Sequence, residues 1–433
     1  MIKSFKPYLF SISMLLATSV SAQNLEDVYQ QVLQSDPRLL IGTLGSGVYA
    51  AREDIAFAAL LPSVSLSGNW TENKRLSEGS SKDSYSGERY TLSISQPVIN
   101  MARYYDWKKS KDTSAVGEYQ RQSEQSYVRL DTIYRYFTVL SAMDEMALVL
   151  EERISTEKKL EHATALYEMQ RIKVTEIYTV RARLDMLMAE EIDAMQVLNT
   201  AKESLSELTN SPINDISPLI ESAEYIQQVV NIDEWGSDSI TINSKLLALQ
   251  KSIDAAQNNV SQRSAEHYPV LALQLNKQKS NIGFESSLSP STTTEVALLN
   301  LTIPIYSGGR IKAGTYEASQ QLAIAQAEYD KEKRKVIKDT RDMFLGVNAM
   351  VRRVEAADKA RKSAGKSYQA MNRSYELSIA TVSEVLDSQR DYSEAKRNYQ
   401  RAKYDYVLKK TELFHLSGKL NDGVFYKISK WLM

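Results

Sequence analysis

A long tandem repeat constrains the fold of this 433-residue chain more than any other feature. LP at 61–62 is matched by YP at 268–269, and QPV at 96–98 by IPI at 303–305, with each pair 207 positions apart. A period of roughly 20–50 residues would predict a solenoid. Because this period is much longer, we predict one elongated body with two large pseudo-symmetric halves. Each half is expected to run helix, strand, strand, long helix, turn and long helix.

The first 22 residues are typical of a secretory signal peptide. They combine a basic start at Lys3 and Lys6, the apolar stretch LFSISMLLA, and small residues from Val20 to Ala22. The alternative is a short membrane anchor, but the apolar stretch is well below the roughly 20 residues that span a bilayer. No later segment reaches about 18 uninterrupted apolar residues, so no transmembrane helix is expected in the mature chain.

Charge and composition exclude several classes of function. Lys plus Arg number 53 and Asp plus Glu number 54, so no net field attracts nucleic acid. The lack of Cys excludes disulfides and lipid attachment at Cys. His162, His267 and His415 do not have the spacing of metal ligands, and there is no phosphate-binding glycine loop. We therefore expect no enzyme activity, no cofactor and no metal.

Very long helices are expected over most of the remaining chain. From Val336 to Tyr375 the sequence keeps alternating steps of four and three residues, which is a heptad seam that contains Arg361. Neither of the segments 101–167 and 309–375 contains Pro, and Gly is sparse in both. Each segment is therefore expected to extend about 100 Å as a helix that needs partner helices along its length.

Those partner helices are predicted after two turns that begin at equivalent tyrosines, Tyr167 and Tyr375, 208 positions apart. The returning helices are expected over 175–209 and 381–417. In both turns, YEMQRIKVTE and YELSIATVSE, a Thr or Ser precedes a Glu that can cap the returning helix. Shorter helices are expected over 24–60 and 241–267, leading into strands.

Four segments alternate apolar and polar residues with a period of two, namely 63–70, 90–95, 271–276 and 296–303. They are separated by polar, Ser- and Gly-rich loops, ENKRLSEGSSKDSYSGE and KQKSNIGFESSLSPSTTT. Each strand is expected to have about 8–11 residues, enough to cross a bilayer when tilted. Four strands cannot close a barrel with a polar lumen, so three copies and twelve strands are predicted. The alternative is a soluble sheet packed on helices.

These elements divide the chain into five parts. They are a signal peptide (1–22), a first structural repeat (23–209), an equatorial connector (210–240), a second structural repeat (241–417) and a C-terminal equatorial tail (418–433). The connector, which carries Pro212, Pro218 and Trp235, is expected to form a small belt midway along the helices. The tail is expected to pack on that belt through Phe425, Tyr426 and Trp431.

The most specific motifs of the chain are the opening NLEDVYQQ at Asn24, LTIPIYSGGR at the end of the fourth strand, and YELSIATVSEVLDSQ at the second turn. In these motifs the sequence resembles the TolC family of outer-membrane exit ducts. The resemblance implies a mainly α fold with a membrane β-barrel, in which a homotrimer joins a twelve-stranded outer-membrane barrel to a long α-helical coiled-coil tunnel. It also implies a passive channel in the outer-membrane lipid, with a long periplasmic extension. The expected partners are a periplasmic adaptor and an ABC or proton-driven inner-membrane transporter.

The resemblance implies a constriction formed by Glu384 and Asp387, which lie three apart near a helix start and so on one face. Threefold symmetry would turn them into six carboxylates around a narrow mouth, and such rings select cations. The alternative interpretation is that acids simply stabilise a helix N-terminus.

The resemblance also implies a gate in which Tyr375 of the second turn contacts Thr175 and Glu176 of the first. The family often has Arg in the second turn where this chain has Ala380, so Arg171 or Lys173 of the first turn is a possible substitute charge. The family also tends to have a glycine in each turn, whereas this chain has Gln170 and Ser378. We therefore expect a different conformation at the tips.

The expected cargo stays open between a multidrug efflux pump and type I protein secretion. A periplasmic coiled-coil adaptor or structural rod would also explain the helices and the signal peptide. It would not explain four alternating strands of bilayer length. A secreted soluble binding protein needs no helices this long.

Overall fold

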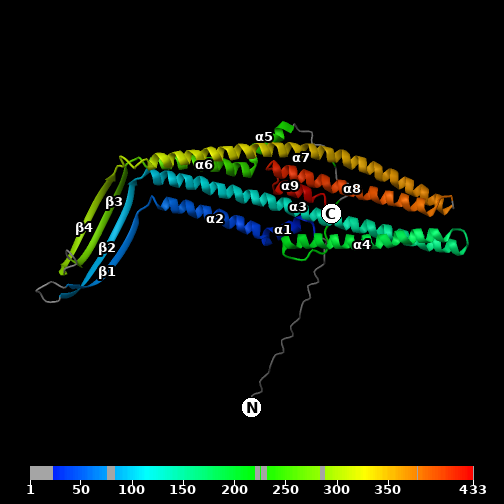
Figure 1. Cartoon of the computed structure of the whole chain (residues 1–433), viewed down its shortest axis with the longest axis horizontal. Helices are drawn as coiled ribbons and strands as arrows, with labels where there is room; N and C mark the ends of the chain where they lie inside the picture. Colours follow the sequence, from blue (N-terminus) through cyan, green and yellow to red (C-terminus); the bar gives the residue numbers. More distant parts are fainter. Residues whose placement is uncertain are drawn as a thin grey trace, which may run out of the picture. The chain divides into compact units, whose positions relative to one another are not determined.

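The computed structural model describes residues 23–75, 83–219, 225, 232–282, 288–377 and 379–432 (Figure 1). The expected signal peptide lies outside these residues. The described chain is mainly helical with one four-stranded sheet, as predicted. In these ranges no helix is both long enough and apolar enough to cross a membrane.

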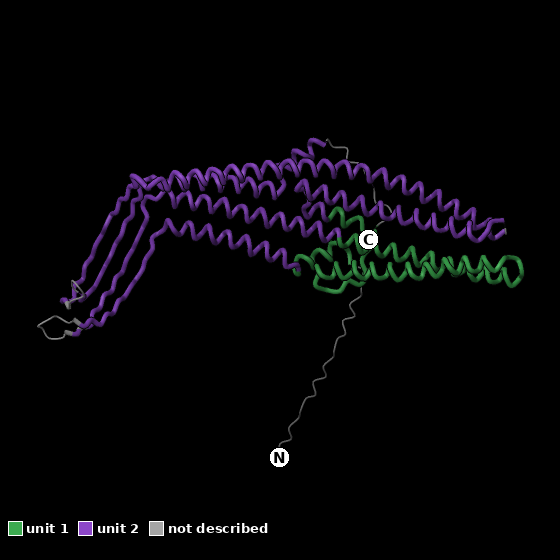
Figure 2. Tube along the Cα trace, in the orientation of Figure 1, with its two compact units in different colours: residues 1–35, 135–224, 426–433 green, residues 36–134, 225–425 purple. Residues whose placement is uncertain are grey.

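The chain divides into two compact units (Figure 2). Unit 1 comprises residues 1–35, 135–224 and 426–433, and unit 2 comprises residues 36–134 and 225–425. Unit 2 contains segments from both repeats. The boundary between the units therefore does not coincide with the boundary between the repeats.

The tandem repeat is confirmed by the bounds of the elements. Three pairs of elements are offset by the same 207 residues: α1 (Leu25–Ser35) with α5 (Ile232–Ile242), α2 (Pro37–Ala58) with α6 (Ser244–Ala265), and β1 (Ser63–Arg75) with β3 (Val270–Ile282). Asp36 and Asn243 occupy equivalent positions and cap α2 and α6. Because α5 begins at Ile232, the first helix of the second repeat begins inside the range 210–240 that we expected to be connector.

The four strands form one antiparallel sheet in the order β1-β2-β3-β4, with β2 (Asp83–Ile99) and β4 (Leu288–Thr302) completing it. The strands have 13 to 17 residues and are longer than expected. The pairing of β1 with β2 continues to Arg75 and Asp83, and that of β3 with β4 to Ile282 and Leu288. Much of what the sequence predicts as loop is therefore strand, because a backbone ladder does not require apolar alternation.

The two longest helices are α3 (Met101–Glu168) and α7 (Arg310–Glu376), with 68 and 67 residues. Their returning partners are α4 (Val174–Thr209) and α8 (Val382–Leu416). In unit 2, α7 packs on α8, and the predicted seam is buried at Val336, Val347 and Val354. Arg361 remains in the seam because its guanidinium stacks 4.9 Å from the ring centroid of Tyr399 on α8.

In unit 1, ion pairs join α3 to α4. The carboxylate of Glu152, 2 % exposed, accepts from Arg183 at 2.5 Å, and Arg153 contacts Glu191 at 2.6 Å. Each helix thus contributes both signs of charge. This reciprocal arrangement fixes the alignment of the two helices, because sliding one past the other would leave a buried charge without its partner.

The first part of the connector and the last part of the tail belong to unit 1. Ile213, Ile216 and Leu219 of the connector are buried, and Leu219 forms a β-bridge with Leu432 of the tail. The hydroxyl of Tyr136 on α3 donates toward the carbonyl oxygens of Gln23 and Ser217 at 3.1 and 3.0 Å. Residues 210–219 of the connector are thus tied to α3 and to the end of the chain, whereas the belt itself stays a prediction. Helix α9 (Asp422–Ser429) occupies half of the tail.

Candidate functional site

The first helical turn joins α3 to α4 in unit 1. Its backbone closes through two hydrogen bonds, from Gln170 N–H to the Tyr167 carbonyl at 2.8 Å and from Arg171 N–H to the Leu166 carbonyl at 2.9 Å. This is the Schellman pattern, which requires a left-handed residue after the helix. Gln170 occupies that position with a φ of 58°. The turn therefore has the conformation that a glycine would favour, although the residue is glutamine.

The start of α4 differs from the prediction. The residue that precedes the helix is Lys173, and no side chain caps the first turn. Thr175 and Glu176 lie inside the helix instead of capping it. The expected cap is therefore wrong for this turn, because the helix begins before the Thr.

The second turn joins α7 to α8 in unit 2 and is capped as predicted. Thr381 precedes α8, and its hydroxyl accepts from the Glu384 N–H at 3.4 Å. The Glu384 carboxylate accepts from the Thr381 N–H at 2.8 Å and from its hydroxyl at 2.9 Å. The signal T-x-x-E was visible in the sequence. Ser378 lies outside the described residues.

The two predicted constriction acids have different environments. Hydrogen bonds from the Thr381 backbone and hydroxyl lower the pKa of Glu384, so its carboxylate is charged at neutral pH. Asp387 is exposed, and its carboxylate lies 3.5 Å from the guanidinium of Arg390 on the next turn of the helix. Arg390 was missed by the sequence analysis, although its spacing of three from Asp387 is a recognisable signal. Glu384 thus stabilises the start of its own helix, as the alternative interpretation predicted. The ring itself stays a prediction.

The predicted gate residues belong to different units. Thr175 is exposed and Glu176 is half-buried in unit 1, whereas Tyr375 is 6 % exposed in unit 2. A contact between Tyr375 and the first turn therefore stays a prediction. The possible substitute charges, Arg171 and Lys173, are both exposed.

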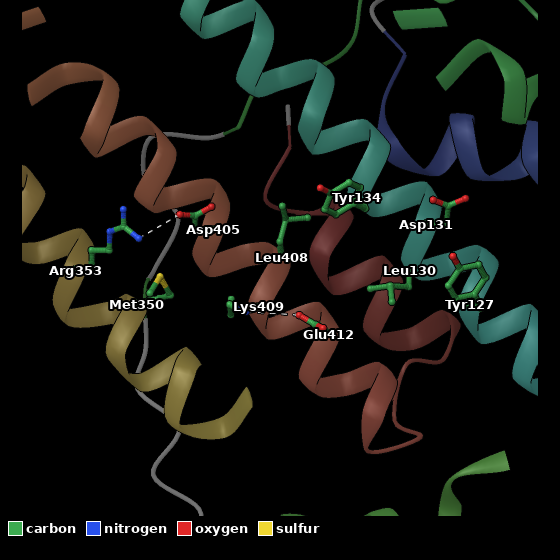
Figure 3. A pocket seen from close by; sticks show the side chains of 10 residues that line it. All are labelled: Tyr127, Leu130, Asp131, Tyr134, Met350, Arg353, Asp405, Leu408, Lys409 and Glu412. Atoms are coloured by element: carbon green, nitrogen blue, oxygen red, sulfur yellow. Dashed lines mark ion pairs between the residues drawn. The ribbon is translucent and has the colours of Figure 1, made fainter. Parts of the chain in front are cut away.

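A cavity of about 570 Å³ opens between α3, α7 and α8 within unit 2 (Figure 3). Its apolar lining includes Leu130, Met350 and Leu408. The charged groups at its edge form pairs, Arg353 with Asp405 at 3.5 Å and Lys409 with Glu412 at 3.8 Å. None of the predicted site residues lines this cavity, so it is distinct from the two turns.

The sheet of unit 2 has two chemically different faces. Directly opposed residues in antiparallel strands point to the same side, so a row across all four strands shares a face. One such row is Val64, Ile94, Leu275 and Ala297. The opposite face carries rows such as Ser67, Thr91, Gln278 and Thr294. Leu298 and Val296 are apolar exceptions on this polar face.

The apolar face is exposed in the chain. Leu66 is 75 % exposed, Trp70 68 % and Leu301 57 %. Toward the hairpin end of the sheet, Trp70 and Tyr90 meet edge to face, with the Trp70 indole N–H 3.0 Å from the Tyr90 hydroxyl. An apolar band that ends in aromatic side chains is typical of a surface at a membrane boundary.

The sequence is similar to known proteins over most of its length. The family model described as "Outer membrane efflux protein" matches residues 28–211 and 235–419. The outer membrane protein TolC of Escherichia coli is 23 % identical over 83 % of this chain and 75 % of its own length. The alkaline protease secretion protein AprF of Pseudomonas aeruginosa is 23 % identical over 76 % of this chain and 71 % of its own.

Solved structures share the fold. The CmeC outer membrane channel of Campylobacter jejuni superposes with a TM-score of 0.81, covering 95 % of this chain and 90 % of its own, at 15 % identity. The open state of the MtrE outer membrane channel of Neisseria gonorrhoeae has a TM-score of 0.79 over 92 % of this chain and 90 % of its own, at 16 % identity.

Proposed function

This chain belongs to the outer membrane efflux protein family, and from that premise we propose that three copies assemble into one continuous duct. The chain is an outer-membrane exit duct and not an enzyme. In the proposed trimer, three four-stranded sheets close into a twelve-stranded barrel in the outer membrane. The long helices continue that barrel as a tunnel through the periplasm.

The observation that carries this proposal is the sheet with one apolar and one polar face. Its exposed apolar face suits lipid, and its Ser-, Thr- and Gln-rich face suits a water-filled lumen. Within the described sheet, β1 and β4 are the edge strands, each hydrogen-bonded to a single neighbour. An open edge is not tolerated in hydrocarbon, so each edge is expected to pair with the other edge of a second copy.

Disulfide cross-linking tests the assembly, because the natural chain has no Cys and gives a clean background. One cysteine replaces Ser65 on β1, and a second is moved along every other residue of β4 from Thr292 to Thr302. Both positions lie on the polar face. At the matching register, we expect oxidation in membranes to produce a ladder that ends at three linked chains.

The matched control places the first cysteine at Ser93 instead of Ser65. Ser93 shares the row of Ser65 but lies on β2, which is bonded to β1 and β3 within the same chain. It should give no links between chains at any β4 position. Ladders from Ser93, or a stable detergent-solubilised monomer from membranes, would contradict the trimer.

The proposed duct is passive and relies on partners for energy. The sequence contains no phosphate-binding glycine loop, which supports an external energy source. We propose that a periplasmic adaptor connects the turn end of the helices to an inner-membrane transporter. The two turns, with Glu384 and Asp387 in the second, are proposed to form the periplasmic mouth of the tunnel.

The cargo is proposed from the relatives' names. The family description names efflux, whereas two relatives are named for secretion of alkaline protease and of proteases. Deleting the gene and measuring both antibiotic susceptibility and the secreted proteome separates the alternatives. Increased susceptibility with unchanged secretion supports efflux, and loss of one secreted protein supports type I secretion.

A further inference from the structure

We propose that Arg89 forms a cationic ring inside the outer part of the barrel and gives that part of the duct a preference for anions. The inference rests on the proposed trimer and adds a selectivity-determining residue to it. Glu384 and Asp387 do not offset this positive charge. They lie at the opposite end of unit 2 from the strand hairpins (Figure 1).

The register of the sheet puts Arg89 on the polar face. Arg89 of β2 lies opposite Asn69 of β1 and Ser280 of β3, and Ser280 lies opposite Thr292 of β4. The next row toward the helices consists of Ser67, Thr91, Gln278 and Thr294. Arg89 is thus a charged side chain among neutral polar ones, on the face proposed to line the lumen.

Among the residues that the structure describes, no ion pair joins Arg89 to an acid on its own face. Its Nε atom is buried and has no hydrogen-bond partner among the described residues. Lys277 and Glu295 do pair, at 2.7 Å, but their row contains Leu66 and Leu92 and so lies on the apolar face.

The depth of the ring follows from its neighbours. Arg89 and Asn69 each precede one member of the aromatic pair Trp70 and Tyr90, which lies on the apolar face. Aromatic side chains collect at the membrane–water boundary of barrels. The ring is therefore expected at the level where the lumen meets the exterior.

Ion selectivity in planar bilayers tests the ring. In a twelve-stranded barrel, three guanidinium groups would lie roughly 8–10 Å from the axis, separated from it by water. With screening at about 0.1 M KCl, removing them is expected to lower the chloride-to-potassium permeability ratio about twofold. Arg89→Gln should show this change, and Arg89→Lys should keep the parent ratio. At about 1 M KCl the difference should vanish, because the Debye length falls to roughly 3 Å.

Lys279→Gln is the matched control. Lys279 directly precedes Ser280, which lies opposite Arg89. Because Lys279 lies opposite Tyr90, it belongs to the apolar face. Its removal should leave the ratio unchanged. If Lys279→Gln shifts the ratio and Arg89→Gln does not, the faces are assigned the wrong way round and the inference is overturned.

Chemical modification gives a second readout on the full-length trimer. In the otherwise Cys-free chain, Arg89→Cys should be modified by charged thiol reagents added from the hairpin side. A cationic reagent should restore the parent ratio, and an anionic reagent should lower it below that of Arg89→Gln. A parent protein that forms no channels would refute the proposed function. Conducting channels with a ratio insensitive to both charges would refute only the Arg89 ring.

Discussion

Thr381 and Glu384 cap each other at the start of α8. The Glu384 carboxylate accepts hydrogen bonds from the Thr381 backbone and hydroxyl at 2.8 and 2.9 Å, and the Thr381 hydroxyl accepts from the Glu384 backbone at 3.4 Å. Glu384 therefore has a structural role in the single chain. Any contribution to a carboxylate ring is made by a side chain that is already oriented toward its own helix end.

The first prediction concerns this cap. Thr381→Ala removes the hydroxyl and should destabilise the first turn of α8 by about 1 kcal/mol, whereas Thr381→Ser keeps an acceptor and should be close to the parent. Amide hydrogen exchange over residues 382–386 measures the difference. Equal exchange in the Ala and Ser variants would show that the hydroxyl does not stabilise the turn.

The same cap should depend on pH. Its hydrogen bonds hold the pKa of Glu384 below the ordinary value of 4.5, so the charged cap stabilises the folded state above that value. This stabilisation should be lost as the pH falls below 4.5 and through the lowered pKa. Glu384→Gln accepts hydrogen bonds but does not titrate, so exchange in that variant should lack this pH dependence. If amide exchange in the parent and in Glu384→Gln depends on pH in the same way, the ionised Glu384 carboxylate does not stabilise the cap.

The second prediction concerns the proposed carboxylate ring. Replacing both Glu384 and Asp387 with Ala should reduce cation preference in planar bilayers and weaken block by multivalent cations, since six charges leave the mouth. Because Arg390 lies 3.5 Å from Asp387, Arg390→Gln should raise the cation preference above that of the parent. Glu317→Gln, an exposed acid near the other end of α7, serves as the control. Unchanged selectivity in the double variant would mean that these acids face away from the tunnel.

The third prediction concerns the proposed gate. Tyr375→Phe removes the hydroxyl and keeps the ring, which is 6 % exposed, so packing should persist. Each lost hydrogen bond contributes only about 0.5–1.5 kcal/mol, and more where Glu176 is charged. Combined with Glu176→Ala, the change should raise single-channel conductance and sensitivity to large antibiotics such as vancomycin. Trimer yield should stay normal.

Tyr167→Phe is the matched control for the gate, since Tyr167 is the repeat equivalent of Tyr375 and is 44 % exposed. It should leave conductance unchanged. Parental conductance in the double variant would exclude Tyr375 and Glu176 as the gate. Arg171→Gln and Lys173→Gln would then test the substitute charges. Thr175→Val would test the proposed contact between Thr175 and the second turn.

The fourth prediction concerns Gln170, whose φ of 58° strains a residue with a side chain. Gln170→Gly should stabilise the first turn by about 0.5–1 kcal/mol, after allowing for the greater freedom of glycine in the unfolded chain. Exchange of the amides at 170 and 171, which close the turn, should slow about two- to fivefold. Gln170→Ala keeps the strain and should bring no gain. Faster amide exchange in Gln170→Gly than in the parent would show that the positive φ of Gln170 does not destabilise the turn.

Much of the architecture could be predicted because it depends on local patterns. The sequence shows the 207-residue repeat, the Pro-free segments of α3 and α7, and the heptad seam from Val336 to Tyr375. A Thr or Ser ahead of Glu384 was predicted to cap α8, and the structure assigns this cap to Thr381. Helix periodicity and capping involve residues three to seven apart, so a linear pattern records them.

The tertiary structure decided features that join distant residues or depend on the backbone alone. Strand pairing extends past Trp70 to Arg75 through polar segments that looked like loops, because ladder hydrogen bonds do not depend on side-chain polarity. The pairing of Glu152 with Arg183 requires α3 and α4 to fold back on each other. Local patterns were enough to predict the kind of elements and their order. Only the folded chain decided where the strands end, which charges meet, and that Arg89 shares a row with Asn69 and Ser280, because register is set by contacts between segments far apart in the sequence.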